Sequence, residues 1–149
     1  MRGVLPLKFQ EQLPENYAEL KKKANYTSSW RDRLDAVNEL AGFKDEKVID
    51  LLTNRMENDT VQQVRIAAYK ALANFGQPVE QPAPYKFDII KGTDKILLRI
   101  VKSLPADADV AAFGDKLKRT RLDVYDAYEG HLGEKFEAWL SEKLAKHKK

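Results

Sequence analysis

The stretch that decides the fold is residues 62–75, QQVRIAAYKALANF, taken together with residues 30–43, WRDRLDAVNELAGF. Placed over each other, the two stretches are offset by 32 residues, and arginine, alanine, leucine and phenylalanine recur at the same places. Apolar residues in both return every three or four positions, which is the period of an amphipathic α-helix. A repeat of roughly 20 to 50 residues is typical of solenoids, in which neighbouring units bury each other's apolar faces.

Each of these stretches is the second helix of a predicted pair. The four helices are expected over residues 15–24 and 30–41, then after Asp45, and finally over 61–75. Ser29 and Thr60 are the predicted N-caps of the second helix in each pair. A serine or threonine followed three residues later by an acid or amide can satisfy free N–H groups at a helix start.

The second pair resembles the HEAT-repeat family, an armadillo-type α-solenoid. Its sequence over residues 47–76 is similar to the family pattern of an aliphatic helix, a turn aspartate, Val-Arg-x-Ala-Ala-x-x-Ala-Leu and a glycine. In that family the turn aspartate and the arginine form a ladder between repeats, and Asp59 and Arg65 match those two positions. The first pair keeps Arg33 but has Thr27 in place of the aspartate. The resemblance covers about residues 15–78.

The sequence therefore predicts an all-α protein: a short HEAT-like solenoid of two helix pairs, followed by further helices. These later helices either extend the solenoid or form a small separate domain. Four segments are expected, namely an irregular N-terminal segment (1–14), the repeats (15–78), a proline-containing linker (79–92) and a helical C-terminal region (93–149).

Composition narrows the range of functions. Of 149 residues, 43% are hydrophobic and 33% charged, which suits a globular protein, and no cysteine is present to form disulfides or thiolate sites. No apolar stretch approaches the roughly 20 residues that a membrane span needs, so no membrane partner is expected. The apolar run at the N-terminus is too short for a secretory signal. We therefore expect a cytoplasmic protein.

An enzyme is not expected. The two histidines, His131 and His147, are predicted to lie in a turn and on the surface of a basic tail, respectively. Neither has a second histidine at metal-ligand spacing, and no glycine-rich phosphate loop is present. The sequence thus predicts no catalytic residues, no cofactor and no metal.

A polar stripe on the second helix of each pair is the predicted binding surface. In a solenoid these helices line the concave face, where partners bind. The residues of the stripe are Arg31, Asp35, Asn38, Gln63, Lys70 and Asn74. The first hypothesis is accordingly a non-catalytic scaffold that engages a partner protein, with self-association also open. The alternative interpretation is that the stripe is only the ordinary polar face that every surface helix exposes to water.

Nucleic-acid binding is the second hypothesis. Residues 1–84 balance 12 basic against 12 acidic side chains, whereas residues 85–149 carry 14 against 11, giving the net charge of +3. The excess falls in the tail 143–149 and in a short run whose cations could contact phosphates: Lys116, Lys118, Arg119 and Arg121. Tyr125 and Tyr128 could stack on bases, but their spacing favours a core position.

Overall fold

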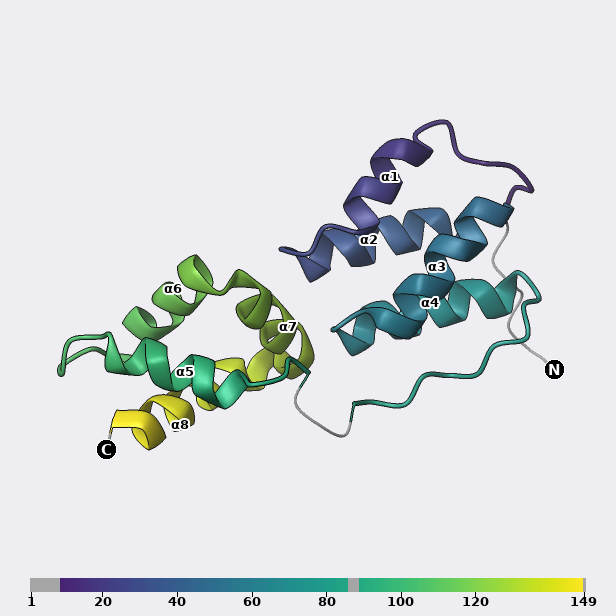
Figure 1. Cartoon of the computed structure of the whole chain (residues 1–149). Helices are drawn as coiled ribbons and strands as arrows, with labels where there is room; N and C mark the ends of the chain where they lie inside the picture. The colour runs from purple at the N-terminus through teal and green to yellow at the C-terminus, as the bar shows by residue number, and fades with distance from the viewer. Residues whose placement is uncertain (1–8, 86–88, 149) are drawn as a thin grey trace. The chain divides into compact units, whose positions relative to one another are not determined.

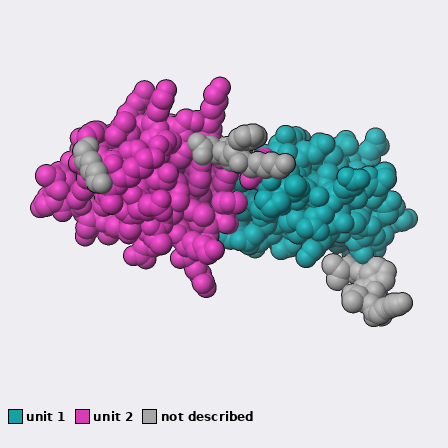
Figure 2. Space-filling view, turned by 90° about the horizontal axis from the view of Figure 1, so that it is seen from below, with its two compact units in different colours: residues 1–84 teal, residues 85–149 magenta. Residues whose placement is uncertain are grey.

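The computed structural model describes residues 9–85 and 89–148, and within them the chain forms eight α-helices and one short 3₁₀ turn. The chain divides into two compact units, residues 1–84 and 85–149, which are coloured separately in Figure 2. Three stretches that the sequence analysis assigned lie outside the described residues: 1–8 of the irregular segment, 86–88 of the linker, and Lys149 of the tail.

The first unit consists of two helix pairs. They are α1 (Tyr17–Ala24) with α2 (Trp30–Leu40), and α3 (Glu46–Asn58) with α4 (Gln62–Asn74) (Figure 1). Each helix packs on its pair partner, and α2 also packs along α4. The two stretches that share the 32-residue offset are therefore neighbouring helices, which confirms the predicted all-α repeat architecture.

Apolar residues at aligned positions of α2 and α4 lie in the core of the first unit, together with buried residues of α1 and α3. Leu40 and Leu72 are fully buried, as are Ala36 and Ala68. Each methylene group removed from water contributes about 0.8 kcal/mol. Because α4 packs on both α2 and α3, it is apolar on two sides.

The helix caps agree with the sequence at one predicted site and differ at the other. The hydroxyl of Ser29 accepts a hydrogen bond from the N–H of Asp32 at 3.2 Å, which confirms that cap. The prediction of Thr60 as a cap is wrong, because α4 begins after Val61 without a side-chain cap. The carboxylate of Asp59 instead accepts from the N–H of Val61 at 2.9 Å.

The described part of the N-terminal segment crosses the turn between α2 and α3. The N–H of Gln10 donates to the carbonyl of Gly42 at 2.8 Å, and the carbonyl of Gln10 accepts from the N–H of Lys44 at 2.7 Å. The ring of Phe9 meets that of Phe75 edge to face at 5.0 Å. Residues 9 and 10 are thus irregular in backbone but packed on the repeats.

The second unit has its own core. Its elements are α5 (Thr93–Lys102), α6 (Val110–Thr120), α7 (Leu122–Leu132), a 3₁₀ turn (Gly133–Lys135) and α8 (Phe136–Lys148). The four helices pack around a set of buried apolar residues: Leu97, Ile100, Val101, Phe113, Leu117, Val124, Ala127, Tyr128, Phe136, Leu140 and Leu144.

Tyr125 and Tyr128 belong to this core, as their spacing predicted. The ring of Tyr128 stacks on that of Trp139 with centroids 4.6 Å apart, and its hydroxyl lies 3.0 Å from Oγ1 of Thr93. Tyr125 meets Phe136 edge to face at 5.0 Å. Neither tyrosine is placed as an exposed stacking platform.

The expectation that His147 lies on the surface is wrong. Helix α8 continues to Lys148 and packs against α5, which leaves His147 only 7% exposed. Its Nε2 lies 3.4 Å from Oδ1 of Asp94 but makes no hydrogen bond within the described residues. His131 is exposed, but the prediction that it lies in a turn is wrong, because α7 continues to Leu132.

Candidate functional site

A buried charge pair fixes the two repeats to each other. The guanidinium of Arg33 on α2 donates from Nε to Oδ2 of Asp59 at 2.9 Å and from Nη2 to Oδ1 at 3.2 Å. Arg55 on α3 reaches the same carboxylate at 3.1 Å. Asp59 is 1% exposed and Arg33 2% exposed. This contact links the first pair to the turn of the second and sets the position of α2 beside α4.

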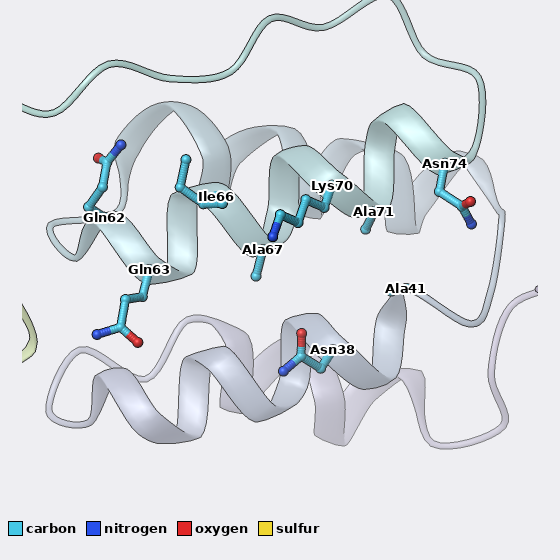
Figure 3. A pocket seen from close by; sticks show the side chains of 9 residues that line it. All are labelled: Asn38, Ala41, Gln62, Gln63, Ile66, Ala67, Lys70, Ala71 and Asn74. Atoms are coloured by element: carbon cyan, nitrogen blue, oxygen red, sulfur yellow. The ribbon is translucent and has the colours of Figure 1, made fainter. Parts of the chain in front are cut away.

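A groove of about 460 Å³ lies between α2 and α4 (Figure 3). Apolar and polar side chains share its lining. The residues are Asn38, Ala41, Gln62, Gln63, Ile66, Ala67, Lys70, Ala71 and Asn74. Pockets of roughly 300 to 1000 Å³ are the usual size for binding sites.

The groove offers an apolar floor with amides at its edges. Ile66 and Ala67 are half-buried and so leave apolar surface in contact with water. Asn38 and Gln63 are exposed, and an amide side chain both donates and accepts hydrogen bonds. Among the described residues that line the groove, Lys70 is the one charged residue. Such a surface can bury aliphatic side chains while bonding to a neighbouring main chain.

The structure brings together four of the six residues predicted for the binding stripe: Asn38, Gln63, Lys70 and Asn74. Arg31 and Asp35 are exposed on α2 but do not line the groove. The guanidinium of Arg31 instead lies 4.5 Å from the centre of the Trp30 ring. Gln62 and the apolar members of the lining were not predicted from the sequence. The spacing of Ile66, Ala67 and Lys70 on one helix was the available signal.

A second hollow, of about 400 Å³, lies between α1 and α3 and has a different character. Its lining is rich in polar and charged side chains, among them Lys21, Lys47 and Asp50, and its one aliphatic residue is Leu51. Burial of Tyr17 there, with Asp45 and Asp50 nearby, raises the pKa of its phenol. Because this hollow has less apolar surface than the groove, it is the weaker binding candidate.

Residues 77–84, which we call the strap, run back along α4 on the side away from the groove (Figures 1 and 3). The side chain of Gln62 donates to the carbonyl of Pro82 at 2.7 Å. Arg65 donates from Nη1 to the carbonyl of Ala83 at 2.9 Å and to Oε1 of Gln62 at 2.7 Å. The strap is therefore attached to the last helix of the repeats.

The four cations of the basic run in the second unit do not share one environment. Lys116 and Arg121 line a hollow between α5 and α6 together with Arg99. Lys118 lies with its Nζ 5.4 Å from the centre of the Tyr125 ring, and Arg119 donates from Nε to the carbonyl of Asp115 at 3.4 Å.

The basic tail forms part of α8 rather than a separate segment. Lys143 and Lys146 reach the carboxylate of Asp94 at 3.3 and 2.9 Å, and Lys148 donates to the carbonyl of Ala108 at 2.8 Å. The hydrogen bonds from Lys146 and Lys143 lower the pKa of Asp94 to about 2. The tail's cations in the described residues are thus bonded within the second unit.

In residues 9–85 and 89–148, no group of three or more histidine, aspartate or glutamate side chains is placed to hold a metal ion. None of the helices described is long and apolar enough to cross a bilayer.

Stacked helix pairs joined by a buried arginine–aspartate contact define the first unit as a short α-solenoid. Residues 17–83 match the family model of HEAT repeats. The match supports the assignment of this segment, a little under half of the chain, to HEAT repeats. Members of the family commonly act as protein-interaction scaffolds and are typically non-catalytic. No curated protein and no solved structure matches the chain.

Proposed function

We propose that the HEAT-repeat segment is a binding module that holds a partner protein in the groove between α2 and α4. The observation that carries this proposal is the groove itself, where aligned helices of two repeats place an apolar floor between amide side chains. Asn38 from α2 and Gln63, Lys70 and Asn74 from α4 contribute the polar groups.

The lining indicates what kind of segment would fit. Aliphatic side chains of a partner would cover Ile66, Ala67 and Ala71, and this burial would supply most of the affinity. The amides of Asn38 and Gln63 would bond to polar groups of the partner's main chain. Lys70 would favour an acidic residue at that point of the partner, which would add specificity more than affinity.

Differential capture tests the proposal. The full chain and the variants Ala67→Arg and Lys70→Glu would serve as bait in a lysate, and recovered proteins would be identified by mass spectrometry. Ala18→Arg and Lys22→Glu, both at exposed positions of α1, make the same chemical changes away from the groove. A purified candidate partner would then be titrated directly against each bait.

We expect the wild type and the α1 variants to bind the partner equally, and Ala67→Arg to bind it at least about tenfold more weakly. Circular dichroism would establish that each variant retains its helices. A partner whose affinity is unchanged by both groove variants would refute the groove as its binding site. Loss with the α1 variants alone would assign binding to the outer helices.

Nucleic-acid binding through the basic run is not the function we propose. Of the four cations in that run, Lys116 and Arg121 share a surface with Arg99, whereas Lys118 and Arg119 contact groups elsewhere. Contacts to many phosphates along a backbone favour a continuous basic strip.

A further inference from the structure

A hollow of about 310 Å³ lies between α5 and α6 in the second unit, and three cations frame it. Arg99 comes from α5, Lys116 from α6 and Arg121 from the end of α6. Ile96 and Ile100 form its apolar wall. Ser103 and Thr120 complete the lining, which contains no carboxylate among the residues the structure describes.

The three cations differ in exposure and in how many of their N–H donors already make hydrogen bonds. Arg121 gives Nε and Nη2 to the carboxylate of Asp123, at 3.0 and 2.9 Å, while its Nη1 makes no hydrogen bond within the described chain. Hydrogen bonding to Asp123 raises the pKa of Arg121 further. Lys116 is half-buried and Arg99 is exposed. With Asp123 included, the hollow retains an excess of two positive charges.

The two hydroxyl groups are not free to donate to a ligand. Ser103 donates to the carbonyl of Ile100 at 2.6 Å, and Thr120 donates to the carbonyl of Lys116 at 2.7 Å. Donors for a ligand would therefore come from the guanidinium and ammonium groups.

Helix polarity alone does not account for this arrangement. Cations near a helix C-terminus balance its partial negative charge of about half an elementary charge. Lys118 and Arg119 already lie in the last turn of α6, and Arg99 and Lys102 lie in the last turn of α5. Lys116 and Arg121 are additional to these four cations, and together with Arg99 they face the same hollow.

We propose that this hollow binds the phosphate group of a small organic phosphomonoester. A phosphomonoester carries a charge of about −1.5 to −2 at neutral pH, which matches the excess in the hollow. A guanidinium binds phosphate oxygens through two parallel N–H bonds, and Nη1 of Arg121 together with Arg99 can supply such donors. The apolar part of the ligand lies against Ile96 and Ile100.

Titration of the isotope-labelled full chain, followed by amide chemical shifts, tests this site. The probes are phenyl phosphate, inorganic phosphate and a single-stranded oligodeoxynucleotide without a terminal phosphate. We expect saturable shifts with phenyl phosphate that centre on residues 96–103 and 116–121. Inorganic phosphate should bind the same residues more weakly, because it leaves the isoleucine wall uncovered.

Variants of equal charge separate a site from general attraction. Arg99→Gln and Lys116→Gln each remove one cation from the hollow, whereas Lys118→Gln and Arg119→Gln remove one from the same region of surface outside it. We expect the first two to weaken phenyl phosphate binding about tenfold and the control pair to change it less than twofold. The unperturbed amide spectrum verifies folding in each case.

Three outcomes would overturn the proposal. Phenyl phosphate could give no saturable shifts at millimolar concentration. All four variants could lose affinity equally, which would indicate diffuse attraction to a basic surface. The oligonucleotide could bind the same residues more tightly than phenyl phosphate, which would assign the hollow to a nucleic-acid backbone. None of these results depends on the groove of the first unit.

Discussion

Arg33 and Asp59 form a two-bond contact between the first and second repeats that is almost completely buried. Asp59 also accepts the N–H of Val61 at the start of α4 and a bond from Arg55. One carboxylate thus joins three elements, α2, α3 and α4. Removing one member of a buried charge pair costs much more than breaking an exposed pair, because the remaining charge stays desolvated.

Asp59→Asn should therefore destabilise the first unit by about 3 kcal/mol or more, since the amide keeps the shape but not the charge that faces Arg33 and Arg55. Urea unfolding followed by the indole N–H signal of Trp30 would measure this. The matched control is Asp123→Asn, which breaks an exposed contact of the same geometry with Arg121 and is followed at the indole N–H of Trp139 in the second unit. It should cost under about 1 kcal/mol. If the two variants lost the same free energy of unfolding, burial would not be what makes the contact between Arg33 and Asp59 stabilising.

The repeat architecture was predictable because burial leaves a periodic trace in the sequence. Leu40 and Leu72 are both fully buried, at positions offset by 32 residues. The ladder was predictable through the family resemblance, which assigned Asp59 to the turn position. Its observed partner is the arginine of the preceding repeat, Arg33, and the aligned Arg65 bonds to the strap.

The groove could be predicted only in part. Helical spacing placed Asn38, Gln63 and Lys70 on matching sides of their helices, and these residues do meet in one lining. The half-buried floor of Ile66 and Ala67 was not predicted, because sequence periodicity separates buried from exposed faces but does not show the boundary between them. The strap was not predicted either, since the acceptors that hold it are main-chain carbonyls.

In the second unit, too, the sequence predicted only part of where the side chains lie. The run 116–121 reads as one basic block, but residues on an α-helix turn by about 100° each and face different sides. His147 was read as part of a solvated tail. Its spacing from Leu140 and Leu144 places it on the buried face of α8, which was a usable signal. The approach of Arg99 to Lys116 depends on packing between α5 and α6.

Attachment of the strap predicts a change in protease sensitivity. Gln62→Ala removes the bond to the carbonyl of Pro82 and a contact that positions Arg65. Cleavage by a glutamate-specific protease after the exposed Glu80 should become several-fold faster, because local opening precedes cleavage. Gln63→Ala is the control, since Gln63 points toward α2 in Figure 3 and lines the groove. The same cleavage rate in wild type and Gln62→Ala would mean that the strap is held by other contacts.

Gly114 lies in close packing between α6 and α8. A Cβ placed there would lie 3.3 Å from Cδ1 of Leu140, between α6 and α8. Gly114→Ala should stay within about 1 kcal/mol of wild type, because a gain in helix propensity offsets a small shift of the leucine. Gly114→Val should lose about 1–3 kcal/mol through overpacking. Ala111→Val, at an exposed position of α6, should cost less than 1 kcal/mol, and thermal unfolding would rank the three variants.

The contact of Asp94 with α8 predicts a pH-dependent contribution to stability. Hydrogen bonds from Lys146 and Lys143 lower the pKa of Asp94 from 3.8 to about 2. The unfolded chain then binds a proton more readily than the folded one, so this contribution is fully present above pH 3.8 and is lost as the pH falls toward 2. Its size should not exceed about 1 kcal/mol, because 48% of the Asp94 side chain is exposed and the pair is screened.

The difference in unfolding free energy between wild type and Asp94→Asn should therefore be positive at pH 6 and shrink steadily below pH 3.8. Urea unfolding monitored at the indole N–H of Trp139, which lies in the same unit, would measure it. Asp107→Asn replaces an exposed aspartate that makes no ion pair in the described part of the chain, and its difference from wild type should stay near zero across this range. Added salt should reduce the Asp94 effect at pH 6. A difference that stays constant down to pH 2 would show that Asp94 stabilises the helix start through its shape and not through its charge.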